Sequence, residues 1–490
     1  MIPTFSEHKL LFVGAVLCVI AAWFTIGYHH PDEHFQILEF ANYKLGRIPA
    51  SDLPWEFPAK IRPGLQPFMA YGTILFADTL GISNPFIQVF LMRLLCAFAA
   101  LFVYWNWSKW LTRDLKNATT IYWMRLGLLF FWLMPYLNVR FTSENTSAIC
   151  FFGGLLLLVQ SIENQRHGFS WKLIFAGLLL GLSFFFRYQI AFAGIGLGAW
   201  LVFQNRLKWS VWVALSTGVV IAICLGFATD FWLYDALVFA PYNYYFSNIV
   251  EGKAAGFGIE PFWWYLTETP MALVPPLSIA LIAFFGIGIW QKPRHPLTWC
   301  VVPFILAHSL VAHKEVRFLF PLAMPFFFLA AAGWEYFQAK YTVKKWMVIG
   351  FTVCFWLNAI LLTVRIFFPA EGRVAYSKFL WDWYQTHPES TVYFVKKEPK
   401  KRFPLNTPFY ENPHQHQMPW YTDPVYKNDT SAIRPGDLML FTEIFSPLPE
   451  APPGFQLKRV FSNYPDWVLL NNTNGWQNRT RIWGIYRLER

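Results

Sequence analysis

Long apolar runs recur along most of the chain. A run of about 18 or more apolar residues can cross the roughly 30 Å hydrocarbon core of a bilayer. The pattern predicts about eleven such spans, at residues 9–27, 86–107, 120–137, 145–161, 173–186, 190–204, 210–229, 271–290, 297–312, 318–336 and 346–364. Residues 63–80 are expected to add a short or re-entrant helix. The chain is therefore predicted to be a polytopic α-helical membrane protein.

The charge of the chain follows the same pattern. Only 14% of the residues are charged and the net charge is +11, whereas a soluble domain carries about 25% charged residues. The basic residues lie mostly in alternate short loops, as the positive-inside rule predicts for cytoplasmic loops. The net charge thus reports membrane topology, and no nucleic-acid partner is predicted. No cleavage pattern follows the first apolar run, which is read as a retained signal-anchor span.

The remaining loops face the lumen or periplasm by parity. They include residues 29–36, 140–144, 187–189, 230–268 and 313–317, and the C-terminal segment follows on the same side. Two domains are expected: a transmembrane domain over 1–365 and a small α/β domain over 366–490. Short β-like runs at 391–395, 437–443, 455–461, 467–471 and 481–488 support the second domain.

The first polar cluster, His29-His30-Pro31-Asp32-Glu33-His34-Phe35-Gln36, comes directly after the first span. Pro31 is suited to open a helix with Asp32 and Glu33 in its first turn, where the helix dipole favours anions. The apolar positions 35, 38, 41 and 45 share one face, which predicts an amphipathic helix in the membrane interface. The two carboxylates either only favour the helix start or belong to a catalytic site.

A second cluster, His313-Lys314-Glu315-Val316-Arg317, occupies a short outward loop between two apolar runs. A charged residue deep in a bilayer costs about 2.5–3.5 kcal/mol, so such residues suggest a function. Basic groups on an outward loop also oppose the positive-inside trend and suggest an anion such as phosphate. The other interpretation is a basic hairpin in which Glu315 is paired internally. Arg140 and Arg187 lie at two more outward ends, either as snorkelling residues or as parts of a basic collar.

These clusters belong to an ordered series of motifs. The series comprises His30-Pro31-Asp32-Glu33, Trp55-Glu56 with Arg62 and Pro67, Arg140-Phe141-Thr142-Ser143-Glu144, the stretch from Asp230 to Asn243, and His308-Ser309 with His313-Lys314-Glu315-Val316-Arg317-Phe318; Thr407-Pro408-Phe409-Tyr410 with His414 follows in the tail. The series resembles glycosyltransferase family 22 of the GT-C superfamily, the lipid-linked-sugar mannosyltransferases of GPI-anchor and N-glycan precursor assembly. It looks most like the third mannosyltransferases of GPI assembly. Pro63 and Gln189 depart from the family pattern.

The resemblance implies a GT-C fold and inverting transfer of mannose from a polyprenyl (dolichyl-type) phosphate donor. The acceptor would be a mannosyl glycan or glycolipid, and the new bond an α-mannoside, α-1,2 by the closest resemblance. Asp32 would be the general base, with Glu33 second or orienting the acceptor. Arg187, His313, Lys314 and Arg317 would bind the donor phosphate. Acceptor or donor sugar would contact His30, Gln36, Trp55, Glu56, Arg62, Glu144, Gln189, Asn243 and Glu315.

The resemblance requires no cofactor, although a divalent metal near Asp32 and Glu33 would be compatible with the residues. It places the active site on the lumenal side of the endoplasmic reticulum membrane, or on the periplasmic side of a bacterial cytoplasmic membrane. The alternative is a transporter or flippase of a lipid-linked or anionic substrate. A transporter favours polar sites at the membrane midplane, whereas these motifs gather on one predicted face. The oligomeric state is left open.

Overall fold

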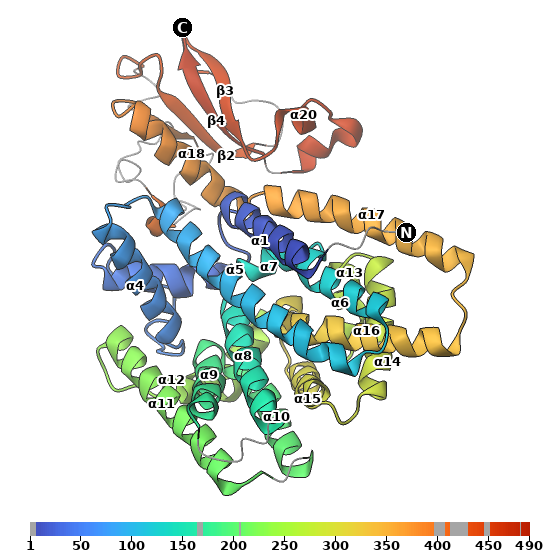
Figure 1. Cartoon of the computed structure of the whole chain (residues 1–490). Coiled ribbons are helices and arrows are strands. Elements are labelled where there is room, and N and C mark those ends of the chain that lie inside the picture. Colours follow the sequence, from blue (N-terminus) through green and yellow to red (C-terminus); the bar gives the residue numbers. More distant parts are fainter. Residues whose placement is uncertain are drawn as a thin grey trace. The chain divides into compact units, whose positions relative to one another are not determined.

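The computed structural model describes residues 6–163, 170–204, 207–395, 407–411, 430–444, 451–480 and 482–490. It divides into two compact units (Figure 1). One is a helical unit made of Met1–Thr25 and His30–Phe368, and the other comprises Ile26–His29 and Pro369–Arg490.

The helical unit contains long helices linked by shorter ones. Its helices are α1 (Glu7–Phe24), α2 (Pro31–Glu33), α3 (Glu39–Lys44), α4 (Leu65–Thr79), α5 (Pro85–Trp110), α6 (Ala118–Phe130), α7 (Met134–Asn138), α8 (Ser143–Glu163), α9 (Trp171–Phe186), α10 (Ala191–Gln204), α11 (Trp209–Tyr234), α12 (Ala240–Tyr245), α13 (Trp264–Ala272), α14 (Leu277–Gln291), α15 (Pro296–Leu310), α16 (Ala323–Lys340) and α17 (Lys345–Phe367). The predicted short helix at 63–80 is α4.

Six helical stretches among the described residues are long and apolar enough to cross a membrane: Glu7–Phe24, Pro85–Asp114, Ser143–Glu163, Trp209–Tyr234, Val316–Lys340 and Lys345–Phe367. Four shorter apolar helices are Trp171–Phe186, Tyr188–Phe203, Leu277–Gln291 and Pro296–Leu310. Together these stretches overlap every predicted span except 120–137. That segment is not one helix, because α6 ends at Phe130 and α7 begins at Met134 with Pro135 in its first turn, a position that suits proline better than a helix interior.

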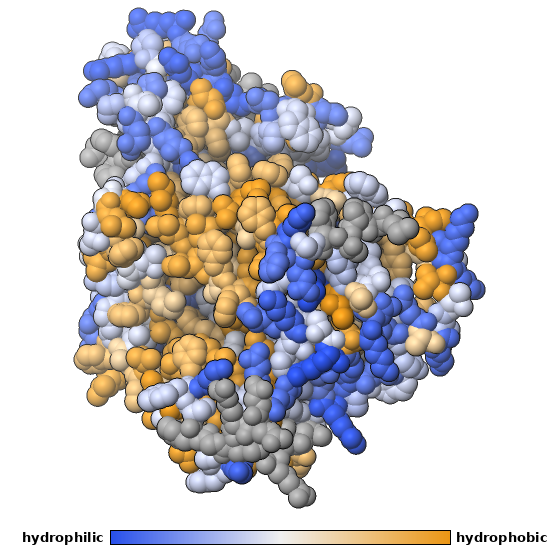
Figure 2. Space-filling view, viewed as in Figure 1, coloured by the Kyte–Doolittle hydropathy of each residue, from blue (hydrophilic) through white to orange (hydrophobic). Residues whose placement is uncertain are grey.

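Large apolar side chains cover much of the outer surface of the helical unit. Phe12 of α1 is 69% exposed and Phe102 of α5 is 72% exposed. Figure 2 shows a broad expanse of hydrophobic residues over this unit on the face that it presents. Exposed apolar surface of this extent is typical of a membrane-embedded protein.

Close helix crossings in this unit depend on glycine. A Cβ atom on Gly177 of α9 would lie 2.1 Å from the carbonyl oxygen of Leu215 on α11, and one on Gly218 of α11 would lie 2.0 Å from that of Ile174. Small residues at such crossings let two backbones approach in lipid, where packing drives helix association.

The second unit combines helices α18 (Gly372–Thr386) and α20 (Asp466–Leu469) with strands β1 (Val392–Val395), β2 (Leu438–Ile444), β3 (Gln456–Ser462) and β4 (Ile482–Glu489). The sheet order is β1-β2-β4-β3, parallel between β1 and β2 and antiparallel elsewhere. Leu380 of α18 packs in one core with Phe394, Leu440 and Ile485 of the strands.

Four of the five predicted β-like runs are confirmed, although residue 481 lies outside the described residues. The run at 467–471 is wrong, because α20, Asp466–Leu469, takes up its first part. Asp466 opens this helix, where the helix dipole favours a carboxylate.

Candidate active site

After α1 the chain forms a short helix, α2, which contains the candidate base Asp32. Pro31 occupies the first helical position, as predicted, and the Nδ1 atom of His30 accepts a hydrogen bond from the Asp32 N–H at 3.3 Å. The helix continues through a π-helical stretch, His34–Leu38, into α3. Pi-helical turns are frequent at functional sites.

The helix over residues 31–44 differs from the expected amphipathic interface helix, because most of its polar side chains are buried. Gln36 and Glu39 are only 8% and 2% exposed. Glu39 lies 2.7 Å from His34 and accepts a hydrogen bond from Asn42 at 3.1 Å. Several polar side chains of this helix therefore bond to one another within the protein.

Asp32 is held by groups from three parts of the chain. Gln36 donates to its Oδ1 at 2.8 Å, and Arg317 donates to its Oδ2 at 3.0 Å. Burial alone would raise the pKa of Asp32, but the hydrogen bond with His30 and the charges of Arg62 and Arg317 hold that pKa well below its usual range. Asp32 is therefore ionised and can accept a proton once a competing donor leaves it.

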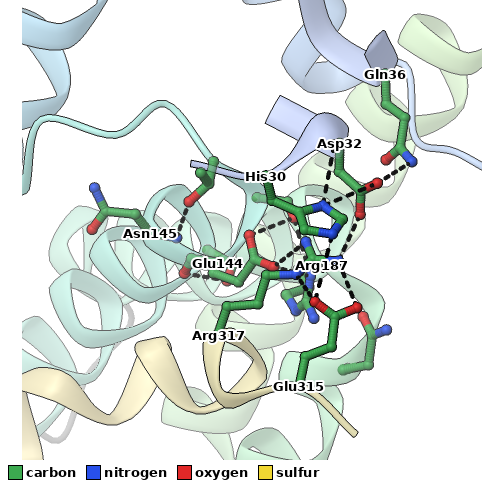
Figure 3. Close-up of polar contacts among 12 residues, drawn as sticks. His30, Asp32, Gln36, Glu144, Asn145, Arg187, Glu315 and Arg317 are labelled. Carbon is green, nitrogen blue, oxygen red and sulfur yellow. Dashed lines mark hydrogen bonds and ion pairs between the residues drawn. The ribbon is translucent and has the colours of Figure 1, made fainter. Parts of the chain in front are cut away.

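Arg317 joins three carboxylates (Figure 3). Its Nη2 donates to Asp32, its Nη1 donates to Glu144 at 3.1 Å, and its Nε donates to Glu315 at 2.5 Å. The guanidinium side chain is only 9% exposed. Arg317 is the second residue of a 3-10 helix, Val316–Leu322, that leads into α16. A planar guanidinium with several N–H donors suits such multiple pairing, whereas an ammonium does not.

Glu144 of α8 connects a second arginine to this cluster. Arg187, at the end of α9, donates to Glu144 at 2.9 Å and to Ser143 at 3.2 Å. Two guanidiniums thus share one buried carboxylate, so the predicted pairing of Arg187 and Arg317 in one site is present.

Glu315 completes the cluster from the outward loop. It pairs with the Nε2 atom of His313 at 3.0 Å and lies 3.6 Å from His30. Burial would raise the pKa of Glu315, but bonding to Arg317 and His313 lowers it from 4.5 to about 2. The internally paired hairpin is therefore present, and Arg317 extends it to Asp32 and Glu144.

A further group of predicted residues adjoins Asp32. Gln36 also donates to Glu56 at 3.1 Å, and Glu56 lies 3.6 Å from Arg62. Arg62 faces the ring of Tyr244 at 5.9 Å, and Gln189 donates to the hydroxyl of Tyr244 at 2.5 Å.

The loop that carries Arg62 is fixed by two residues one turn apart on α11. The Tyr234 hydroxyl accepts from the Arg62 N–H at 3.2 Å and donates to its carbonyl at 2.7 Å, while Asp230 accepts from the Gly64 N–H at 2.7 Å. Tyr234, Asp230 and Tyr244 were not predicted as site residues. For Asp230 and Tyr234 the sequence did contain a signal: the two polar residues lie four positions apart at the end of an apolar run, which places them on one face of a helix.

Other predicted residues lie apart from this cluster in the described contacts. Glu33 is 3.7 Å from Arg140, which also bonds Thr25. Lys314 donates to the carbonyls of Glu260 at 2.9 Å and Val311 at 2.5 Å. The ring of Trp55 is 5.0 Å from Lys253, and Asn243 donates to the Lys60 carbonyl at 3.2 Å. Of the expected basic collar, the contacts among the described residues join Arg187 and Arg317, through Glu144.

The cluster combines an ionised carboxylate with guanidiniums in a largely buried setting, where charges interact more strongly than in water. Such a site can accept a proton and stabilise an anionic leaving group. Across the part of the chain that the structure describes, no group of three or more His, Cys, Asp or Glu residues is placed to hold a metal ion. Metal independence stays a prediction.

The fold is similar to that of a protein whose crystal structure is known. ArnT from Cupriavidus metallidurans, crystallised with undecaprenyl phosphate, superimposes with a TM-score of 0.54 at 12% identity, over 98% of this chain and 97% of that one. Together with the apolar helices, this similarity defines an integral membrane protein of the GT-C fold.

Sequence comparison then gives the family. The profile of the Alg9-like mannosyltransferase family matches residues 10–418, and the chain belongs to this family. GPI mannosyltransferase 3 of Yarrowia lipolytica is 24% identical over 94% of this chain and 95% of its own length. GPI alpha-1,2-mannosyltransferase 3 of Danio rerio is 24% identical over 60% of this chain and 53% of its own. The protein is a glycosyltransferase of the mannosyltransferase class.

His414, which belongs to the predicted tail motif, lies outside the described residues.

Proposed function

We propose that this protein transfers mannose, with inversion, from a polyprenyl (dolichyl-type) phosphate mannose to a mannosyl glycan or glycolipid, forming an α-1,2 bond. The similarity to the GPI mannosyltransferases named above supports an acceptor of the GPI-precursor type. The undecaprenyl phosphate named with the ArnT structure supports a lipid-phosphate donor for this fold.

The observation that carries the proposal is the joining of Asp32 to Arg317, and of Arg317 to Glu144 and Arg187. This arrangement sets the Asp32 carboxylate against the Arg317 guanidinium, and Glu144 joins Arg317 to Arg187. Inverting transfer needs both kinds of group: a base for the acceptor hydroxyl and positive charge for the departing phosphate.

In the proposed reaction the acceptor hydroxyl oxygen attacks the anomeric carbon of the donor mannose. The bond from that carbon to the phosphate oxygen breaks, its electron pair leaves with the polyprenyl phosphate, and the hydroxyl proton passes to Asp32. Arg317 and Arg187 stabilise the phosphate, with His313 and Lys314 as the remaining predicted members of this group. Glu33 stays a candidate for orienting the acceptor.

Arg317 would also control when Asp32 becomes basic enough to accept the proton. A carboxylate bonded to a guanidinium is a weak base, because that bond stabilises its ionised form. A donor phosphate that takes the N–H groups of Arg317 would weaken the Asp32 contact and so raise the basicity of Asp32 when the donor is bound.

The same proposal includes about eleven spans, an outward-facing active site and activity without a metal ion. Protease added to sealed vesicles of known orientation tests the topology. Cleavage of the C-terminal segment from the cytoplasmic side alone would contradict the proposed topology.

Activity that EDTA abolishes and a divalent cation restores would contradict metal independence.

The activity itself is tested with the purified full chain in proteoliposomes, incubated with labelled polyprenyl-phosphate mannose and a panel of mannosyl acceptors. Label should appear in an acceptor product that α-1,2-mannosidase releases. Movement of the labelled lipid across the bilayer without product would instead indicate a transporter.

A further inference from the structure

His308 has a buried nitrogen atom that the proposed reaction does not use. This histidine lies in the last turn of α15 and is only 3% exposed. Its Nδ1 atom is 2.8 Å from the carbonyl oxygen of Phe304. A carbonyl oxygen can only accept, so Nδ1 carries the hydrogen and Nε2 of the neutral ring presents a lone pair. That Nε2 atom has no hydrogen-bond partner.

Arg187 has the opposite kind of unsatisfied group, namely N–H donors without an acceptor. Its Nη1 bonds Glu144 and Ser143, but its Nε and Nη2 atoms are buried without a partner. The Arg187 guanidinium carbon lies 5.0 Å from the centre of the Phe318 ring, and the His308 ring lies 6.2 Å from the same ring. The Arg187 guanidinium and the His308 ring are thus both neighbours of the Phe318 ring.

We propose that His308 and Arg187 form a subsite for one hydroxyl group of the transferred sugar. The inference rests on the proposed function. A hydroxyl donates its hydrogen to Nε2 of His308 and accepts an N–H of Arg187, so it satisfies both groups at once. A phosphate oxygen has no hydrogen to offer and would leave the His308 lone pair unsatisfied.

The surroundings also favour a ligand at this point. The rings of Phe192, Phe304 and Phe318 lie 5.9, 4.2 and 6.2 Å from the His308 ring, so no polar side chain is placed against Nε2. Two of these three rings, those of Phe192 and Phe318, are only partly buried. An unsatisfied buried polar group destabilises a protein, and a substrate hydroxyl would remove that cost on binding.

The test is a coupling measurement between His308 and each sugar hydroxyl. Transfer by the full-length wild type, His308→Phe and His308→Gln is measured with polyprenyl-phosphate mannose and with its 2-, 3-, 4- and 6-deoxy analogues. His308→Phe keeps an aromatic ring among the three phenylalanines, and His308→Gln keeps an acceptor. His295→Phe removes another buried histidine, the cap of the same helix, and is the matched control.

With the mannosyl donor, His308→Phe should lower kcat/KM by about 10–100-fold, and His308→Gln should lower it less. With one deoxy donor the loss from His308→Phe should shrink to about twofold, because the partner hydroxyl is already missing. The control should show the same ratio with every donor. An equal loss with all donors for His308→Phe would overturn the subsite and assign the pair to water or to structure. A wild type that transfers none of the sugars would overturn the proposed function itself.

Discussion

At the scale of single residues, the site is a charge network in which every member has an identifiable partner. Arg317 bonds Asp32, Glu144 and Glu315, and Glu144 also bonds Arg187. Removing one partner of a buried ion pair leaves an uncompensated charge, which costs about 3–5 kcal/mol. The network therefore fixes the position of Asp32 and ties its basicity to the occupancy of Arg317.

Glu315→Gln tests the pH dependence of this network. The folded pKa of Glu315 is lowered from 4.5 to about 2, so its contribution to stability is complete above the unfolded pKa and lost as the pH falls through the folded one. At pH 7 the variant should unfold at a lower temperature than wild type, by a free energy of about 1–3 kcal/mol. The difference should shrink below pH 4.5 and vanish near pH 2.

Thermal unfolding in detergent, followed by tryptophan fluorescence across this pH range, measures the effect. Glu163→Gln is the matched control, because Glu163 pairs with Arg113 at an exposed position where an ion pair contributes about 0–1 kcal/mol. A Glu315→Gln difference that is unchanged between pH 7 and pH 3 would contradict the assignment.

The sequence allowed some of these residues to be predicted and not others. Arg317 was predicted because charged residues beside membrane spans are costly and therefore informative, and Asp32 because the family resemblance assigns it the role of base. The bond between them was not, because it joins positions 285 residues apart. The free lone pair of His308 was equally hidden, since it depends on which carbonyl its other nitrogen contacts. Lys314 belongs to the same motif as Arg317, yet its amine bonds backbone carbonyls.

At the scale of helices, apolar run length predicted most of the fold. It missed the break between α6 and α7, where Pro135 begins a new helix within an otherwise apolar segment. It also could not predict which residues of α11 face the site. Asp230 and Tyr234 do so, and they fix the loop of Arg62 by bonds to its backbone.

Tyr234→Phe tests this positioning role. The substitution removes both hydrogen bonds to Arg62 but keeps the ring. Because Tyr234 positions Arg62, whose charge acts on the proposed base Asp32, we expect kcat to fall about tenfold with less change in KM. Steady-state transfer kinetics measure the split. Tyr71→Phe, whose ring packs on Trp232, should leave both constants near wild type. Equal kinetics for the two variants would contradict the role of Tyr234.

Gly177→Ala tests the crossing of α9 and α11. The added Cβ would lie 2.1 Å from the Leu215 carbonyl oxygen, so the helices must separate, at a cost of about 1–3 kcal/mol. The variant should unfold at a lower temperature in detergent. Gly350→Ala on α17 is the control, because nothing lies within 4 Å of its added Cβ. A Gly177→Ala protein as stable as the control would show that the crossing tolerates separation.

At the scale of the whole molecule, the family relationship covers more than the helical unit. The family match runs from residue 10 to 418, beyond the end of the helical unit at Phe368. The Yarrowia lipolytica relative aligns over 95% of its own length. The complete chain is therefore the appropriate object for functional tests, which should use it intact in a bilayer.

The central claim is that Asp32 accepts the proton of the acceptor hydroxyl. The most direct measurement is single-turnover transfer of labelled mannose by the Asp32→Asn protein in proteoliposomes, with donor binding measured on the same sample. Asparagine keeps the shape of Asp32 but cannot take the proton, so transfer should fall by about 10²–10⁴-fold while donor binding stays near wild type. Transfer at the wild-type rate would contradict the account.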